Sequence, residues 1–123
     1  NVIPSLIEKA LAAEDRLLVW GSGAAQRQFL YVDDLVRALF LLLEADATGV
    51  QYVSPGETVS IAALAATIRD IVRPGLPIAF ETDRPEGSTV LSLPPLHPSL
   101  ASVQWTSLKD GMAKTIDWRR GLT

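Results

Sequence analysis

The run between residues 35 and 43 constrains this chain most, since it reads Leu-Val-Arg-Ala-Leu-Phe-Leu-Leu-Leu. It is apolar on nearly every side of a helical projection, as in helices that are buried on most of their faces. Asp33 stands just before it and is a typical N-cap residue. We therefore predict a central, largely buried helix over residues 34–45.

The composition fits one compact domain over residues 1–123. Hydrophobic residues make up 48% of the chain and charged residues 20%, and a chain of this length can bury a core of its own. The spacing of apolar residues predicts three more helices and several short strands, and a Pro-, Ser- and Gly-rich stretch predicts an irregular loop over residues 84–102. The fold class that we predict is mixed α+β. The helices are expected over 2–13, over 61–72 with Ser60 as the N-cap, and over 108–118 with Ser107 as the N-cap, and the strands over 17–20, 28–32, 50–54 and 77–80.

Charge and cysteine content exclude several classes of protein. The net charge is −3 and the 11 basic residues are scattered, so no basic stripe exists to bind a nucleic-acid backbone. The chain has no cysteine, which excludes a disulfide scaffold, a zinc–thiolate site and a cysteine nucleophile. No apolar run approaches the roughly 20 residues that span a bilayer. We expect a soluble, cytoplasmic protein that binds neither nucleic acid nor membrane.

Three features resemble cofactor or catalytic motifs, and each has a simpler structural interpretation. Residues 21–23 begin like a dinucleotide-binding glycine motif, but Gln26 replaces the third glycine and a strand is predicted to follow. Asp33 and Asp34 resemble an acid–base pair, but a helix start also favours acidic side chains. His97 lies in a proline-rich loop and is predicted to be a solvated loop histidine.

The chain also lacks a Tyr-x-x-x-Lys pair, since Tyr31 leads to Leu35 and Tyr52 leads to Gly56. We predict that it contains no complete catalytic constellation and no metal ligands, and that it binds no cofactor by itself.

One group of residues is suited to recognition rather than catalysis. Trp20 ends a predicted strand beside the glycine-containing loop, Arg27 enters the next strand, and Lys9 lies on the first helix. Tryptophan offers a flat apolar face to a base or sugar, arginine can donate two parallel hydrogen bonds to phosphate, and lysine adds a point charge. These residues predict a phosphate-bearing ligand, although surface cations and an edge tryptophan are also ordinary in any domain.

Three stretches, in this order, resemble the C-terminal half of NAD-dependent epimerase/dehydratases, which are extended short-chain dehydrogenases/reductases. Among these the GDP-L-fucose synthase branch is the most similar. The stretches are NVIPSLI at residues 1–7, VWGSGAAQRQFLYVDDL at 19–35 and SIAALA at 60–65. Residues 53–57, 84–87 and 107–118 extend the resemblance over nearly the whole chain.

The resemblance implies a division of labour with a part of the enzyme that this chain lacks. In that family the first half is a Rossmann domain that holds NAD or NADP and carries the Tyr-x-x-x-Lys pair, and the second half closes over a nucleoside-diphosphate sugar. By position, Arg27 is implied to contact the nucleotide diphosphate, Trp20 to line the substrate site, and Lys9 to be the basic residue of the first helix.

Further site residues follow from the same resemblance. Val2 and Leu6 fall where apolar contacts to the base are made, Asn1 falls at the cofactor edge, and Arg84 completes the substrate-binding set. Residues 88–93 depart from the family, because its usual basic residue and later aspartate are replaced there.

The resemblance predicts the substrate-recognition part of an NAD(P)-dependent nucleotide-sugar epimerase, dehydratase or reductase, inactive by itself. The alternative is a stand-alone interaction or oligomerisation module with the same fold. In either case we expect exposed apolar surface and a homo-oligomer, because large apolar patches tend to be covered.

Overall fold

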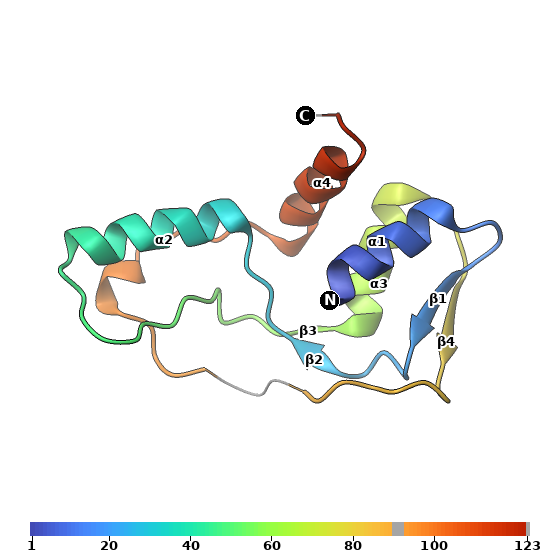
Figure 1. The fold of residues 1–123 in the computed structure, drawn as a ribbon, viewed down its shortest axis with the longest axis horizontal. Helices are drawn as coiled ribbons and strands as arrows, with labels where there is room; N and C mark the ends of the chain where they lie inside the picture. The colour runs from blue at the N-terminus through green and yellow to red at the C-terminus, as the bar shows by residue number, and fades with distance from the viewer. Residues whose placement is uncertain (90–92, 123) are drawn as a thin grey trace.

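The computed structural model describes residues 1–89 and 93–122. Within these residues the chain forms four α-helices, four short strands and one 3₁₀ turn, which confirms the predicted mixed α+β fold (Figure 1). The elements are α1 (Val2–Ala12), β1 (Leu17–Trp20), β2 (Gln26–Arg27), α2 (Val32–Glu44), β3 (Val59–Ser60), α3 (Ile61–Val72), β4 (Ile78–Glu81), η1 (Pro98–Leu100) and α4 (Leu108–Arg119).

The strands form two separate two-stranded sheets. β1 and β4 are parallel, with Leu17 opposite Ile78 and Trp20 opposite Glu81. β2 and β3 are antiparallel and pair only two residues each. The predicted strands over 28–32 and 50–54 are therefore wrong, since these segments have no regular secondary structure before α2 and β3. A strand needs a hydrogen-bonded neighbour, and neither segment pairs with one among the described residues.

The main core lies where α1, α3 and α4 pack together beside β1. Ser60 caps α3, because its Oγ accepts a hydrogen bond from the N–H of Ala63 at 3.0 Å. Ser107 caps α4 in the same way through the N–H of Asp110 at 3.1 Å, as its sequence predicted. The largest fully buried apolar side chains here are Leu17, Val19, Leu64, Ile68 and Ile116.

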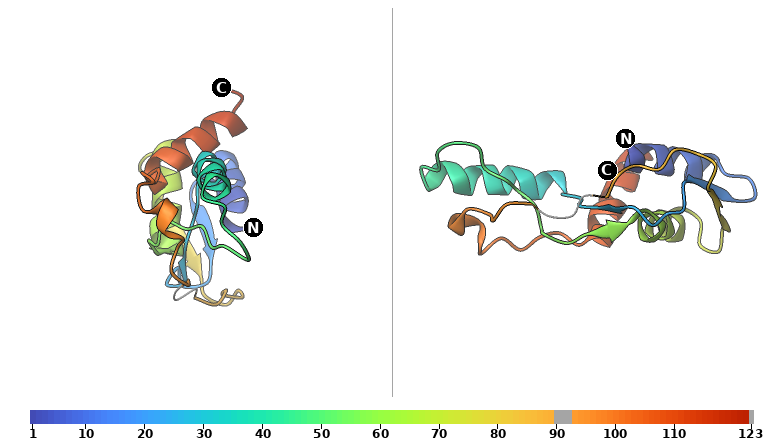
Figure 2. Two further views of the ribbon diagram at one scale, coloured as in Figure 1. Left: turned by 90° about the vertical axis from the view of Figure 1, so that its left-hand side faces the viewer. Right: turned by 90° about the horizontal axis from the view of Figure 1, so that it is seen from below.

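α2 is not the central helix that its sequence predicts. It extends away from α1, α3 and α4, and together with η1 it forms an arm (Figures 1 and 2). The described residues cover only one side of it, where Ala38 and Leu42 pack against Leu100 of η1. The helix also begins earlier than predicted, with Tyr31 at the N-cap position, so that Asp33 lies in the first turn instead of capping the helix.

The opposite side of α2 carries an apolar stripe that is open to solvent. Its six residues recur at the spacing of one helix face, and their exposed fractions range from 37% for Leu35 to 72% for Leu43. We call this surface the α2 stripe: Val32, Leu35, Val36, Leu39, Phe40 and Leu43.

None of the helices in the described part of the chain is long and apolar enough to cross a membrane.

Candidate functional site

A pocket of 330 Å³ opens between the start of α1, the end of β1 and the segment after β4. The structure brings the predicted binding residues of α1, β1 and β2 together here. Six of the seven line the pocket, namely Asn1, Val2, Leu6, Lys9, Trp20 and Arg27. The seventh, Arg84, lies beside Trp20 at the rim.

α1 supplies one wall of this pocket because helical spacing places its pocket residues on one face. Val2, Leu6 and Lys9 recur three or four residues apart, and Asn1 occupies the N-cap position at the open end. Leu6 is buried and contributes apolar surface to the wall, whereas Lys9 lies in the last turn. The wall is therefore apolar near the start of α1 and carries a positive charge near the end of α1.

Trp20 stands at the end of β1 with two cations against its ring. The Lys9 Nζ lies 4.9 Å and the Arg84 Cζ 5.4 Å from the ring centroid, both within range of a cation–π interaction. Lys9 also donates a hydrogen bond to the Leu18 carbonyl at 3.3 Å. The indole remains 52% exposed, so it can still contact a ligand.

Arg27 is held by backbone carbonyls at the other end of the pocket. Its Nη1 donates to the Gln26 carbonyl at 2.9 Å and to the Ser88 carbonyl. A β-carbon at Gly87 would overlap the Arg27 Nη2, so a larger residue there would force the guanidinium to shift. Residues 90–92, part of the stretch that departs from the family, lie outside the described residues.

The glycine loop (residues 21–25) does not form the phosphate-binding turn of a dinucleotide site. Gly21 and Gly23 have positive φ angles of 81° and 79°, and the chain continues into β2 rather than into a helix whose N-terminus could bind pyrophosphate. The loop instead binds a carboxylate of this chain, since the Ser22 Oγ donates to the Glu86 Oε1 at 2.7 Å.

That hydrogen bond is the main reason that the pKa of Glu86 lies below its ordinary value. Partial desolvation opposes the effect, and backbone N–H groups of the glycine loop assist it. Glu86 is therefore ionised at neutral pH.

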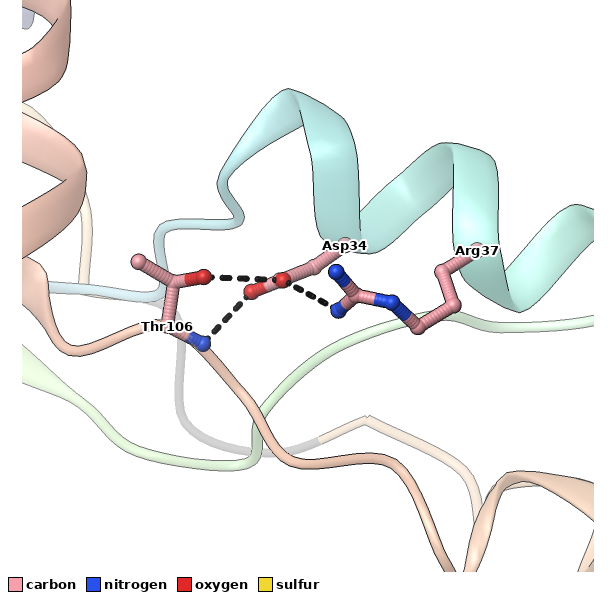
Figure 3. A network of polar contacts seen from close by, with 3 residues as sticks. All are labelled: Asp34, Arg37 and Thr106. Atoms are coloured by element: carbon pink, nitrogen blue, oxygen red, sulfur yellow. Dashed lines mark hydrogen bonds and ion pairs between the residues drawn. The ribbon is translucent and has the colours of Figure 1, made fainter.

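Asp34 makes structural contacts, but with a distant segment rather than with the helix start that the sequence suggested (Figure 3). Its side chain is only 1% exposed and accepts three hydrogen bonds: from the Thr106 N–H at 2.7 Å, the Thr106 hydroxyl at 2.9 Å and Arg37 at 3.0 Å. Burial raises the pKa of Asp34 and is the largest single effect, but the hydrogen bonds and the Arg37 charge together outweigh it and lower the pKa. The carboxylate joins α2 to the segment before α4.

His97 is not simply a solvated loop residue. It is half-buried and occupies the N-cap position of η1, where its Nδ1 accepts a hydrogen bond from the Ser99 N–H at 3.2 Å. The side chain thus stabilises the turn that packs against α2.

A second pocket of 340 Å³, which was not predicted, lies between the start of α1, the 29–31 linker and α4. Its lining is mainly apolar and aromatic, with Phe29, Tyr31 and Trp105, and includes no lysine or arginine. Lys114 lies beside this pocket, with its Nζ 5.3 Å from the Tyr31 ring centroid, but only the first pocket has basic side chains in its lining, which favours the first pocket as the site of an anionic ligand. No sequence signal marks this second pocket, because its walls come from four separate segments.

Known proteins resemble this chain in sequence. Residues 1–62 match the sequence profile of the NAD dependent epimerase/dehydratase family. A putative GDP-L-fucose synthase 2 from Arabidopsis thaliana is 33% identical over 127 residues, which cover 96% of this chain and 38% of that protein. A dTDP-4-dehydro-6-deoxy-D-allose reductase from Streptomyces bikiniensis is 34% identical over 122 residues, covering 98% of this chain and 37% of the reductase.

Solved structures also resemble this chain in fold. A GDP-L-fucose synthetase from Naegleria fowleri, in a crystal structure with NADP, superposes on 98% of this chain with a TM-score of 0.83 and 25% identity. A UDP-N-acetylglucosamine 4-epimerase from Methanobrevibacter ruminantium, in complex with UDP-N-acetylmuramic acid, covers the whole chain with a TM-score of 0.78 and 26% identity. In both cases the chain spans 40% of the solved structure, and it spans about two fifths of the curated relatives.

Proposed function

The chain belongs to the NAD dependent epimerase/dehydratase family, as its motifs predicted, and on this premise we propose that it is the part that recognises the nucleotide sugar. The parent enzyme would be an NAD(P)-dependent epimerase, dehydratase or reductase of nucleotide sugars. The observation that carries this proposal is the convergence of Trp20, Lys9 and Arg27 on one pocket.

The chemistry of the pocket fits a nucleoside diphosphate. The guanidinium of Arg27 and the ammonium of Lys9 supply donors for the diphosphate, and the Trp20 ring supplies a flat face for a sugar or base. Val2 and Leu6 offer apolar contact to the base. The volume of 330 Å³ is within the range of small-molecule sites but near its lower end, which suits partial enclosure of the ligand by this chain.

We propose that this chain does not hold NAD or NADP by itself. Asn1 is the only predicted cofactor contact, it lies at the pocket rim, and the glycine loop precedes a strand rather than a helix. When bound elsewhere in the parent enzyme, the dinucleotide would supply hydride transfer. This chain contributes the ligand's position, and in isolation we expect it to be catalytically silent.

The exposed α2 stripe favours the presence of a partner domain that packs against α2. Six apolar side chains on one exposed helix face are unusual for a surface that stays in water. We propose that the cofactor-binding part of the parent enzyme covers this face. The stripe also favours the second candidate function, a stand-alone interaction or oligomerisation module, in which another protein surface covers it.

Ligand binding separates the two candidates. We would titrate GDP, UDP and dTDP by calorimetry into the complete natural polypeptide that carries this chain, and into its Arg27→Ala and Trp20→Ala variants. Losing a charged hydrogen-bond donor to phosphate should weaken binding at least tenfold in Arg27→Ala. Arg16→Ala is the matched control, because Arg16 is exposed and lies outside the pocket.

The outcomes are distinct. Binding of a nucleoside diphosphate that is weakened in Arg27→Ala and unchanged in Arg16→Ala supports nucleotide-sugar recognition. If the wild type binds none of the three diphosphates, the recognition function is refuted and the interaction module becomes the better explanation.

A further inference from the structure

The parallel pairing of β1 with β4 brings two loops side by side. Trp20 is opposite Glu81 at the end of the ladder, so the glycine loop leaves β1 beside the segment that leaves β4. Residues 84–89, which we call the clasp segment, then follow the glycine loop and β2 in the same direction. In Figure 1 the chain after β4 passes below β2.

Four contacts join the clasp segment to the chain that runs from Trp20 through the glycine loop to β2. They run from one end of the pocket to the other: the Arg84 guanidinium against the Trp20 ring, the Glu86 carboxylate on the Ser22 hydroxyl, the Ser88 carbonyl on Arg27, and the Thr89 Oγ1 accepting from the Gln26 N–H at 3.3 Å. The two ligand-facing side chains, Trp20 and Arg27, are thus each touched by the clasp segment.

Glu86 lies at the middle of this arrangement. The Ser22 hydroxyl donates a hydrogen bond to Glu86 and accepts one from the Ala24 N–H at 3.2 Å, so it acts both as a donor and as an acceptor. A β-carbon at Gly21 would lie 3.1 Å from the Glu86 Cγ, which shows how closely the carboxylate side chain covers the loop. One side chain therefore fastens the clasp segment to the turn between Trp20 and Arg27.

We propose that Glu86 is a positioning residue for the ligand, which rests on the proposed function of the pocket. By holding the glycine loop against the clasp segment, Glu86 sets the separation between the Trp20 ring and the Arg27 guanidinium. These two groups stand on either side of the loop, so a loop that moves freely would present them at varying distances. A prepositioned pair binds a diphosphate and its attached base or sugar at a smaller entropic cost.

Electrostatics alone predicts the opposite effect for the same residue. The Glu86 carboxylate is part of the pocket wall and repels a phosphate, so a neutral side chain should strengthen the binding of an anion. The sign of the change in affinity therefore separates a positioning residue from a mere charge in the wall.

The test measures the affinity for GDP, UDP or dTDP, whichever binds the wild type most tightly, in the complete natural polypeptide. We expect Glu86→Ala to weaken binding about threefold to tenfold, the range for losing one net hydrogen bond, and Glu86→Gln to weaken it less, because its amide oxygen can still accept from the Ser22 hydroxyl. Ser22→Ala should have a similar effect, and the Ser22→Ala/Glu86→Ala double variant should add little to it because the two residues act as a pair. Glu14→Ala, at an exposed glutamate outside the pocket, is the matched control.

Hydrogen exchange supplies a readout that general destabilisation would not reproduce. In Glu86→Ala the amides of residues 21–26 should exchange faster, while the amides of α3 and α4 and the melting temperature stay as in the wild type. Equal or tighter binding by Glu86→Ala overturns the positioning role.

The two proposals fail in different ways. If Arg27→Ala abolishes binding while the Glu86 variants bind as well as the wild type, only the positioning role is lost. If the wild type binds no nucleoside diphosphate, the pocket's proposed function is lost, and the positioning role is lost with it. Hydrogen exchange then shows only whether Glu86 still fastens the loop.

Discussion

Replacing Asp34 is the sharpest test of how α2 is attached to the rest of the molecule. In Asp34→Ala the Thr106 N–H and hydroxyl both lose their acceptor in a nearly closed site. A buried donor without a partner costs about 1–3 kcal/mol, and the hydroxyl can rotate toward another acceptor whereas the N–H cannot. We therefore expect a loss of about 2–3 kcal/mol in the free energy of unfolding.

Two further variants, Asp34→Asn and Arg37→Ala, separate the contributions of the individual hydrogen bonds to stability. In Asp34→Asn the amide oxygen can still accept from the Thr106 N–H while the hydroxyl turns to accept from the amide nitrogen, so the loss should be about 1 kcal/mol. Arg37→Ala removes only a cation that is 55% exposed, and such pairs contribute at most about 1 kcal/mol and often nothing. The expected order of destabilisation is Asp34→Ala, then Asp34→Asn, then Arg37→Ala.

The assay is urea-induced unfolding at several pH values, together with exchange of the Thr106 amide. Because the folded-state pKa of Asp34 lies below its ordinary value of 3.8, its contribution is fully present above that value and is lost as the pH falls through the lowered pKa. The difference between wild type and Asp34→Asn should thus be constant near neutral pH and shrink below about pH 4. A loss under 0.5 kcal/mol in Asp34→Ala, or an Arg37→Ala loss larger than that of Asp34→Asn, would refute the reasoning.

Three further predictions concern a cap, a turn and the exposed helix. Ser60→Ala should lower the free energy of unfolding by about 1 kcal/mol in urea titrations, and an unchanged midpoint would show that the cap on α3 is dispensable. Gly23→Ala should cost about 2 kcal/mol, because φ is +79° and the added β-carbon would lie 2.5 Å from a Phe80 ring carbon; near-wild-type stability would contradict this strain. The chain alone should self-associate in light scattering, and Leu39→Asp with Phe40→Asp should reduce its apparent mass; a wild type that stays monomeric at every concentration would remove the α2 stripe as an interface.

Local features could be predicted from the sequence because neighbouring residues decide them. Helical spacing and capping serines placed α1, α3 and α4 to within a residue or two, and the Ser60 and Ser107 caps were identified before any contact was known. Six of the residues that line the candidate pocket were also identified, since the family resemblance assigns roles by position in the chain. Their role in binding is still a prediction.

Relations between distant segments could not be predicted in this way. The apolar sequence of α2 correctly indicates a helix that needs to be covered, but not which surface covers it, and in this structure only the η1 side is covered. The strands predicted over 28–32 and 50–54 failed for the same reason, because pairing depends on a neighbour that composition does not specify.

The sequence by itself determined the presence of the helices, the Ser60 and Ser107 caps, the family and the identity of the predicted binding residues, because these depend on local spacing and on motif order. Only the tertiary structure decided that Glu86 meets Ser22, that Asp34 serves Thr106 rather than acid–base chemistry, and that Trp20 and Arg27 face one pocket. The physical reason is that these hydrogen bonds join residues that are 64 and 72 positions apart in the chain. Whether such residues meet depends on how β1 pairs with β4 and on the direction in which α2 leaves the core, and no local sequence pattern encodes these arrangements.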